Sequence, residues 1–172
     1  IENLTGNTGN DTFAFIGTGS VPGAINGGAG TDTLDYSLYD TGFSTGVTVD
    51  LLAGTATNVG GAVSAVENLI GTPFNDVLTG NNSANRIEGL AGDDLLYGRG
   101  GNDTYVFADG YGTDTITEDS AAGTDTLDFS AVTTDLLFTL GSVTVTTGAN
   151  TATHTANNIE ALIGGLGDDT FA

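Results

Sequence analysis

The sequence predicts an all-β fold, a parallel solenoid of short stacked coils, from three observations. Glycine and aspartate recur at a fixed nine-residue spacing along much of the chain. The 172 residues include 28 glycines, and threonine, valine and aspartate are abundant while runs of helix-forming residues are short. Between the glycine-rich stretches, apolar and polar residues alternate, as strands with one buried face require.

The nine-residue pattern is clearest in residues 89–106, where GLAGDDLLY is followed directly by GRGGNDTYV. Glycine holds the first and fourth places, aspartate the sixth, and an apolar or aromatic residue the eighth. The pattern recurs in the windows 6–14, 27–35, 71–79, 80–88, 89–97, 98–106, 109–117, 120–128 and 164–172. The sixth place holds Asp11, Asp32, Asp76, Asp94, Asp103, Asp114, Asp125 and Asp169, with Asn85 as the exception.

Each window predicts a turn followed by a short strand. The first six residues form the turn, because glycine supplies backbone angles that side chains forbid. The last three form the strand, with the eighth residue pointing inward. One unit cannot bury its apolar row alone, so units must stack. We expect successive windows to alternate sides, as in a parallel β-roll, with about eighteen residues in a full coil.

This stacking places the sixth-place side chains in columns. The predicted columns are Asp76, Asp94 and Asp114 on one side, Asn85, Asp103 and Asp125 on the other, and Asp11 with Asp32 if residues 18–26 are a degenerate window. Carboxylates about one strand spacing apart, ~4.8 Å, repel one another without a cation between them. Oxygen ligands without cysteine favour a hard cation, and calcium suits flexible oxygen sites better than magnesium does.

The windows resemble the RTX, or haemolysin-type, calcium-binding repeats of secreted bacterial proteins, most clearly over NLIGTPFNDVLTGNNSANRIEGLAGDDLLYGRGGNDTYVF (68–107). The resemblance implies a β-roll with several calcium ions held by the eight aspartates and by turn carbonyls. The implicated carbonyls belong to Gly6, Thr8, Gly27, Gly28, Ala29, Gly30, Gly89, Ala91, Gly92, Gly98, Gly100, Gly101, Gly110, Gly112, Gly123, Gly164, Gly165 and Gly167. Residues 73–74 and 83–85 depart from the repeat pattern, so we expect the calcium sites around 80–85 to be absent or incomplete.

The sequence also contains a longer repeat, which includes several of the nine-residue windows. GTDTLDYS (30–37) returns as GTDTLDFS (123–130), and VENLIG (66–71) returns as IEALIG (159–164), both 93 residues later. We therefore expect a first solenoid repeat in 1–79 and a second in 80–172, forming one continuous solenoid within a longer array. The two stretches without the motif, 38–65 and 131–158, predict longer strands that continue or flank the solenoid.

Composition limits the function. The formal net charge is −20, with two Lys or Arg residues against 22 Asp or Glu residues. This balance argues against nucleic acid and anionic membranes as partners, because both need a basic face. No apolar run approaches the ~20 residues of a transmembrane helix. Calcium and neighbouring copies or repeats of the same protein are the expected partners.

The chemistry of the side chains disfavours an enzyme. The chain has no cysteine and one histidine, and it lacks the HExxH zinc motif. Adjacent carboxylates such as Asp93–Asp94 could suggest a glycosidase, but sequence neighbours on a turn usually serve one ion. We expect a structural calcium-binding module of a large extracellular or cell-surface bacterial protein, such as a surface layer, adhesin or filament, which folds on calcium after secretion. The alternatives are the secretion and folding module of an RTX protease or lipase, and a ligand- or ice-binding adhesin segment.

Overall fold

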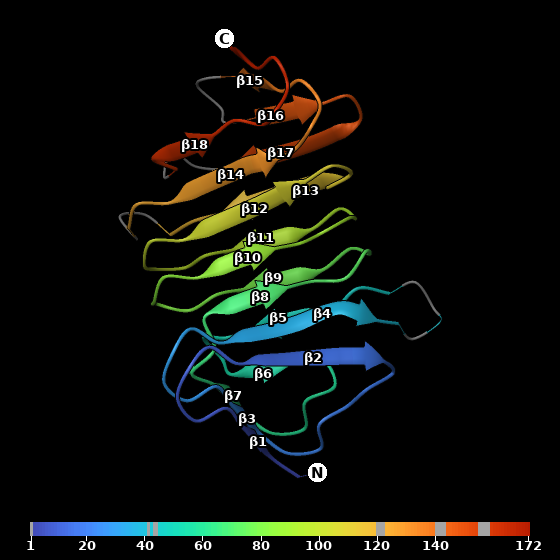
Figure 1. The fold of residues 1–172 in the computed structure, drawn as a ribbon, viewed down its shortest axis with the longest axis vertical. Coiled ribbons are helices and arrows are strands. Elements are labelled where there is room, and N and C mark those ends of the chain that lie inside the picture. The colour runs from blue at the N-terminus through green and yellow to red at the C-terminus, as the bar shows by residue number, and fades with distance from the viewer. Residues whose placement is uncertain (1, 41, 43–44, 120–122, 140–143, 155–158) are drawn as a thin grey trace.

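The strands lie one above another in a stack that runs from the N-terminus to the C-terminus (Figure 1). The computed structural model describes residues 2–40, 42, 45–119, 123–139, 144–154 and 159–172. Parallel pairing dominates, so the predicted all-β parallel roll is confirmed. None of the described residues belongs to a helix long and apolar enough to cross a membrane.

Seven parallel strands form one row of the stack, in the order β18, β14, β12, β10, β8, β4, β2. They are β2 (Thr12–Gly17), β4 (Thr33–Tyr39), β8 (Asn68–Ile70), β10 (Arg86–Glu88), β12 (Thr104–Ala108), β14 (Thr126–Ala131) and β18 (Ala161–Ile163). β2, β4, β10 and β12 directly follow turns of the nine-residue pattern, so the row places the ends of these turns along one edge of the stack.

The opposite row is divided between two sheets. Three parallel strands, in the order β1, β3, β7, form the N-terminal part: β1 (Leu4–Thr5), β3 (Ile25–Asn26) and β7 (Val63–Ser64). Nine strands, in the order β19, β15, β16, β17, β13, β11, β9, β5, β6, form the rest. They are β5 (Thr48–Asp50), β6 (Thr55–Ala56), β9 (Val77–Thr79), β11 (Leu95–Tyr97), β13 (Thr113–Thr117), β15 (Leu137–Thr139), β16 (Thr144–Thr147), β17 (Asn150–His154) and β19 (Thr170–Phe171).

Residues 68–105 wind with the predicted eighteen-residue period. In register, Leu69 pairs with Ile87, Ile87 with Tyr105, and Leu78 with Leu96. Successive windows therefore alternate between the two rows, as expected. The strands on either side of residue 79 pair directly, β8 with β10 and β9 with β11, so the sheets continue across the predicted boundary between the long repeats.

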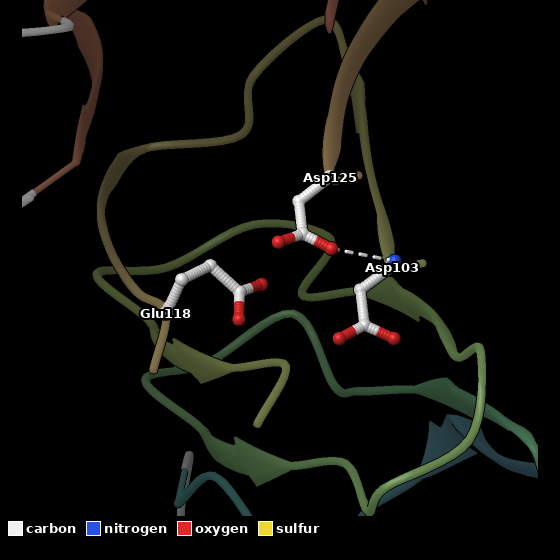
Figure 2. A group of neighbouring side chains, drawn as sticks. All are labelled: Asp103, Glu118 and Asp125. Atoms are coloured by element: carbon white, nitrogen blue, oxygen red, sulfur yellow. Dashed lines mark hydrogen bonds between the residues drawn. The ribbon is translucent and has the colours of Figure 1, made fainter. Parts of the chain in front are cut away.

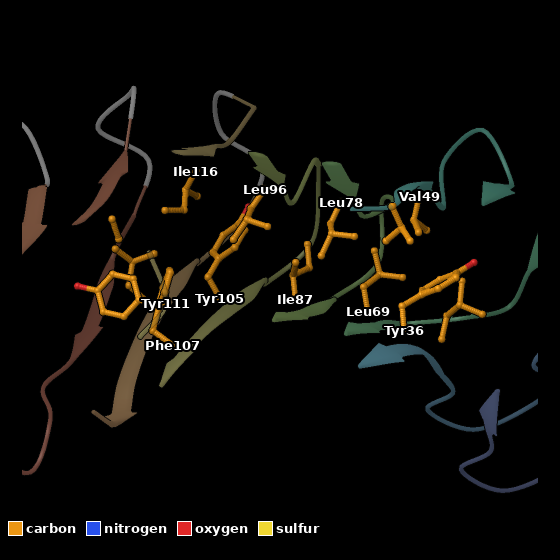
Figure 3. Packing of buried hydrophobic residues seen from close by; sticks show 14 of the residues in the cluster. Tyr36, Val49, Leu69, Leu78, Ile87, Leu96, Tyr105, Phe107, Tyr111 and Ile116 are labelled. Carbon is orange, nitrogen blue, oxygen red and sulfur yellow. The ribbon is translucent and has the colours of Figure 1, made fainter. Parts of the chain in front are cut away.

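The eighth-place side chains fill the space between the two rows (Figure 3). Seven are at most 1% exposed: Leu34, Leu78, Ile87, Leu96, Tyr105, Ile116 and Leu127. Phe171 also faces inward, because its ring stacks on that of the buried Phe138 at 4.5 Å, but it is 58% exposed since it lies on the outermost strand of its sheet. Phe13 is only partly buried.

Two matching aromatic stacks show the long duplication in three dimensions. The rings of Phe15 and Tyr36 stack at 4.5 Å, and those of Phe107 and Phe129 stack at 4.4 Å. The strand pairs that carry them, β2–β4 and β12–β14, also share a one-residue shift of register. The two long repeats thus fold alike where their sequences match.

The stretches without the motif add antiparallel strands to the nine-stranded sheet. In the first, β5 pairs antiparallel with β6; in the second, β16 pairs antiparallel with both β15 and β17. They flank the coils, as predicted, although parts of both stretches lie outside the described residues. In each stretch one backbone N–H donates to a sixth-place aspartate, but the sequence separation differs between the two. Val47 and Asp76 are 29 residues apart, whereas Leu136 and Asp169 are 33 residues apart.

Candidate metal centre

A buried ladder of side-chain hydrogen bonds joins the turns beside the seven-stranded row. The backbone N–H of one sixth-place residue donates to the carboxylate of the equivalent residue in the next turn. These bonds run from Asp11 to Asp32 (2.8 Å), Asp32 to Glu67 (2.8 Å), Asn85 to Asp103 (2.7 Å), Asp103 to Asp125 (2.8 Å) and Asp125 to Glu160 (2.8 Å). Asn85 Nδ2 donates to the Glu67 carbonyl (2.8 Å) and completes the column.

A second ladder runs along the opposite row. Its bonds run from Val47 to Asp76 (2.7 Å), Asp76 to Asp94 (2.8 Å) and Asp94 to Asp114 (3.0 Å), with a separate rung from Leu136 to Asp169 (3.1 Å). The predicted columns are therefore confirmed as neighbours in space. The ladder stops at Asp114 because the next strand, β17, presents Ala152 at that level.

Glu67 and Glu160 are ladder members that the nine-residue pattern does not predict. Each accepts the backbone hydrogen bond that an aspartate accepts elsewhere. A signal for them exists in the sequence: an acid precedes an inward leucine by two residues in both, as Asp32 precedes Leu34. The longer glutamate side chain thus replaces an aspartate where the window lacks a full turn.

Exposed fifth-place side chains form outer links in the opposite direction. The backbone N–H groups of later turns donate to earlier side chains: Thr31 to Asn10 (3.0 Å), Asp93 to Asn75 (3.0 Å), Thr113 to Asp93 (3.1 Å) and Thr124 to Asn102 (3.0 Å). These four pairs of neighbouring turns are therefore joined twice, once in the interior and once at the surface.

Four turns leave a buried carboxylate oxygen free, and we call them the open turns: 6–11, 27–32, 89–94 and 98–103. The Oδ2 atoms of Asp11, Asp32, Asp94 and Asp103 are buried without a hydrogen-bond partner among the described residues. In each open turn the second residue has a positive φ: Asn7 (84°), Gly28 (105°), Leu90 (74°) and Arg99 (79°). A positive φ is costly for leucine and arginine, so these turns hold a strained backbone.

Three other turns satisfy the same oxygen internally, and we call them the closed turns: 71–76, 80–85 and 164–169. Their second residues do not have a positive φ. The N–H of the second residue instead donates to the sixth side chain, from Thr72 to Asp76 (2.6 Å), Asn81 to Asn85 (2.7 Å) and Gly165 to Asp169 (2.8 Å). The backbone conformation of the second residue therefore decides whether the sixth-place oxygen has a protein donor.

The open turns fit a cation with oxygen ligands. A buried carboxylate oxygen without a partner is unfavourable, and burial raises the pKa of Asp94 to about 7 and that of Asp103 to about 6. A Cβ added to Gly6 would collide with both the Gly27 carbonyl oxygen and Asp11 Oδ2. Carbonyl and carboxylate oxygens therefore converge beside the first glycine, as the ligands of a hard cation do.

Comparison with protein families agrees with this geometry. Four copies of the RTX calcium-binding nonapeptide repeat match residues 24–37 and 70–105. This chain carries RTX calcium-binding nonapeptide repeats. The matched residues include three of the open turns and two of the closed turns. A search of curated proteins found no match to the module.

The carbonyls implicated by the RTX resemblance have different surroundings in this module. Those of Ala29, Gly92 and Gly112 accept hydrogen bonds from Gly9 (2.7 Å), Thr113 (3.3 Å) and Thr151 (2.7 Å). Those of Gly27, Gly89 and Gly98 face the first glycine of the preceding turn in the same column. A ligand role stays a prediction for these carbonyls and for those of Gly6, Thr8, Gly28, Gly30, Ala91, Gly100, Gly101, Gly110, Gly123, Gly164, Gly165 and Gly167.

One acidic cluster in the RTX module includes a residue outside the repeat windows. Oxygen atoms of Asp103, Glu118 and Asp125 lie within 4.8 Å of one another, and all three residues are buried (Figure 2). The Tyr105 hydroxyl donates to Glu118 Oε1. Glu118 follows the window 109–117, so the nine-residue spacing could not predict its position.

Proposed function

We propose that this RTX module is a non-enzymatic structural segment of a larger extracellular bacterial protein, and that calcium completes its fold. The observation that supports this function best is the set of open turns, where four buried carboxylate oxygens lack a partner among the described residues. A structural role accounts for ligands placed in the turns that join the coils, where a bound cation links one coil to the next.

We assign calcium first to the open turns. Their carboxylates come from Asp11, Asp32, Asp94 and Asp103, and the ladder brings Asp114 and Asp125 against the last two. In the closed turns, by contrast, Asp76 and Asp169 already accept hydrogen bonds from their own turns. A hydrogen-bond donor there takes the place that a cation takes in an open turn.

The energetic contribution of such sites is large enough to control folding. At an ion concentration ten times the dissociation constant, one site stabilises the folded state by about 1.4 kcal/mol. Four open turns would contribute about 6 kcal/mol, which is comparable with the whole stability of a typical domain. Calcium sites of extracellular modules work at about 0.1–1 mM, so the module would fold outside the cell.

Circular dichroism tests the proposal directly. We expect the β signal at neutral pH to be lost in excess EDTA and restored by millimolar calcium. Magnesium at the same concentration should restore much less, because it demands six ligands in strict geometry and keeps its waters. An unchanged β signal in EDTA would show that calcium does not control folding.

The assembly context is part of the same proposal. Strands on either side of residue 79 pair directly, which supports neighbouring repeats of the same protein as the partners that this architecture favours. A surface layer, adhesin or filament would use such an array. The hydrolase-module and ice-binding alternatives stay predictions from the sequence.

A further inference from the structure

Glu118 is a buried acidic residue that the repeat pattern does not explain. It directly follows β13 and is 5% exposed, although a charged side chain is almost never buried without a partner. Its Oε1 accepts the hydrogen bond from Tyr105, while its Oε2 is buried without a partner among the described residues.

The Glu118 carboxylate occupies a place that a turn carbonyl occupies elsewhere. A Cβ added to Gly71 would lie 2.8 Å from the Gly89 carbonyl oxygen, and one added to Gly80 would lie 2.7 Å from that of Gly98. At Gly98 itself, the nearest atoms to an added Cβ are Glu118 Oε1 and Asp103 Oδ2. A charged oxygen thus replaces a neutral carbonyl oxygen at this one level of the column.

Three carboxylates converge without a cationic side chain to neutralise them. Asp103 and Asp125 are 1% exposed, and Asp103 Oδ2 also has no partner within the described part of the chain. The ion pairs of the described residues join Arg86 to Glu88 and Arg99 to Asp119, so neither arginine pairs with this cluster. Figure 2 shows the three carboxylates facing a common space.

We propose that Glu118 completes a three-carboxylate calcium site with Asp103 and Asp125, distinct in composition from the sites of the other open turns. The proposal rests on the calcium-binding function proposed above. Calcium affinity rises with the number of charged ligands, so this site binds calcium more tightly than the other sites. Tyr105 acts as a positioning residue, because its hydroxyl holds one carboxylate oxygen and leaves the other directed at the ion.

Terbium luminescence can test this site. Terbium replaces calcium at oxygen sites and emits when a nearby aromatic residue absorbs light. The chain has no tryptophan and five tyrosines, so only tyrosine excitation contributes near 280 nm. In the wild-type module, the tightest terbium site should emit by transfer from Tyr105, and calcium should displace that terbium.

Glu118→Gln keeps the shape of the side chain and its acceptor for the Tyr105 hydroxyl but removes the charge. We expect it to weaken the tightest terbium and calcium binding at least tenfold. Asp119→Asn is the matched control: it removes the same charge one residue away, from a side chain that is 62% exposed, and should change binding less than twofold. Equal binding by the two variants would overturn the proposal.

A measurement on the wild-type module decides the question if Glu118→Gln does not fold. The chain has five glutamates, so ¹³C labelling of glutamate carboxyls gives few signals. Calcium should shift the carboxyl signal of Glu118 strongly and that of Glu88, which pairs with Arg86, only weakly. If calcium folds the module but leaves Glu118 as little shifted as Glu88, this site is wrong while the proposed function stands. If neither calcium nor terbium binds the wild-type module, the proposed function itself fails.

Discussion

Neighbouring aspartates in one turn have opposite surroundings. Asp93 is exposed and links to the next turn at the surface, whereas Asp94 is fully buried with one oxygen unpartnered among the described residues. The strand that begins one residue after Asp94 explains which of the two is buried. Side chains alternate along it, so Leu96 points into the core, and Asp94, two residues earlier, lies on the same side. The nine-residue spacing could therefore predict which of the two is buried.

The buried carboxylates predict an unusual pH dependence for the calcium-free module. Burial raises the pKa of Asp94 to about 7 and that of Asp114 to about 8, whereas an unfolded aspartate titrates near 4. Between about pH 4 and 8 the folded state binds more protons than the unfolded state, so its stability decreases as the pH rises. Without calcium, we expect more β structure at pH 5 than at pH 8, measured by circular dichroism in EDTA.

Calcium should remove this dependence. The ion binds the ionised carboxylates and displaces their protons, so the calcium-loaded module and the unfolded chain bind nearly equal numbers of protons between pH 5 and 8, and calcium should add more β structure at pH 8 than at pH 5. Asp94→Asn should weaken both pH effects, and Asp93→Asn should weaken them less, because burial raises the pKa of Asp94 and Asp114 more than the charge of exposed Asp93 does. Greater β structure at pH 8 than at pH 5 in EDTA would contradict the argument.

At the scale of the element, the strands are short and depend on single inward residues. β10 contributes only Ile87 to the core, and this side chain is fully buried between its partners in β8 and β12. Replacing a buried isoleucine with alanine usually lowers the free energy of unfolding by about 2–5 kcal/mol, because it leaves a cavity.

We therefore expect Ile87→Ala to destabilise the calcium-loaded module by about 2–5 kcal/mol in urea unfolding. Arg86→Ala, one residue earlier on the outward side, removes an ion pair with Glu88 and should cost less than about 1 kcal/mol. Similar losses in the two variants would show that the alternation in β10 is not what stabilises this coil.

The turns show where prediction from the sequence ends. The sixth-place columns followed from spacing alone. The turn that contains Pro73 and Phe74 is closed, but so is the turn 164–169, which keeps the full pattern. Whether a turn is open or closed depends on the φ angle of its second residue, which is positive at Leu90 and Arg99. Nothing in the preference of leucine or arginine indicates such an angle, so the stacked turns impose it.

The antiparallel strands could not be predicted for a related reason. The stretches 38–65 and 131–158 are equally long, but their ladder contacts fall at different spacings, 29 residues in one repeat and 33 in the other. In the second repeat, the segment before this contact is shorter and the segment after it is longer than in the first repeat. The two differences cancel, so the total length is the same. Counting residues between motifs therefore hid the difference, and only strand pairing revealed it.

At the scale of the whole molecule, charge and calcium act together. A chain of 172 residues with a net charge of −20 repels itself when its carboxylates have no counter-ions. An unfolded chain of this length has a radius of gyration of about 44 Å, and a compact one about 16 Å.

Small-angle X-ray scattering should show this contraction. In EDTA at pH 8 we expect a radius near the unfolded value, and in millimolar calcium a radius of roughly 16–20 Å, since the stack is somewhat elongated. Sodium chloride at 1 M is the control, because it screens charge over ~3 Å without filling the turns. Full contraction in sodium chloride alone would show that screening, not site binding, drives the transition.

The direction of the buried ladder gives the two ends of a growing stack different unpaired groups. At each described rung in which a backbone N–H donates to a ladder carboxylate, the donor belongs to the earlier turn and the acceptor to the later one, from Asp11 and Asp32 through Asp94 and Asp114. Water can replace the outer links at the surface, but not these interior ones. A stack that has grown from its N-terminal side ends in a backbone N–H without a ladder acceptor, whereas one that has grown from its C-terminal side ends in a carboxylate without a ladder donor.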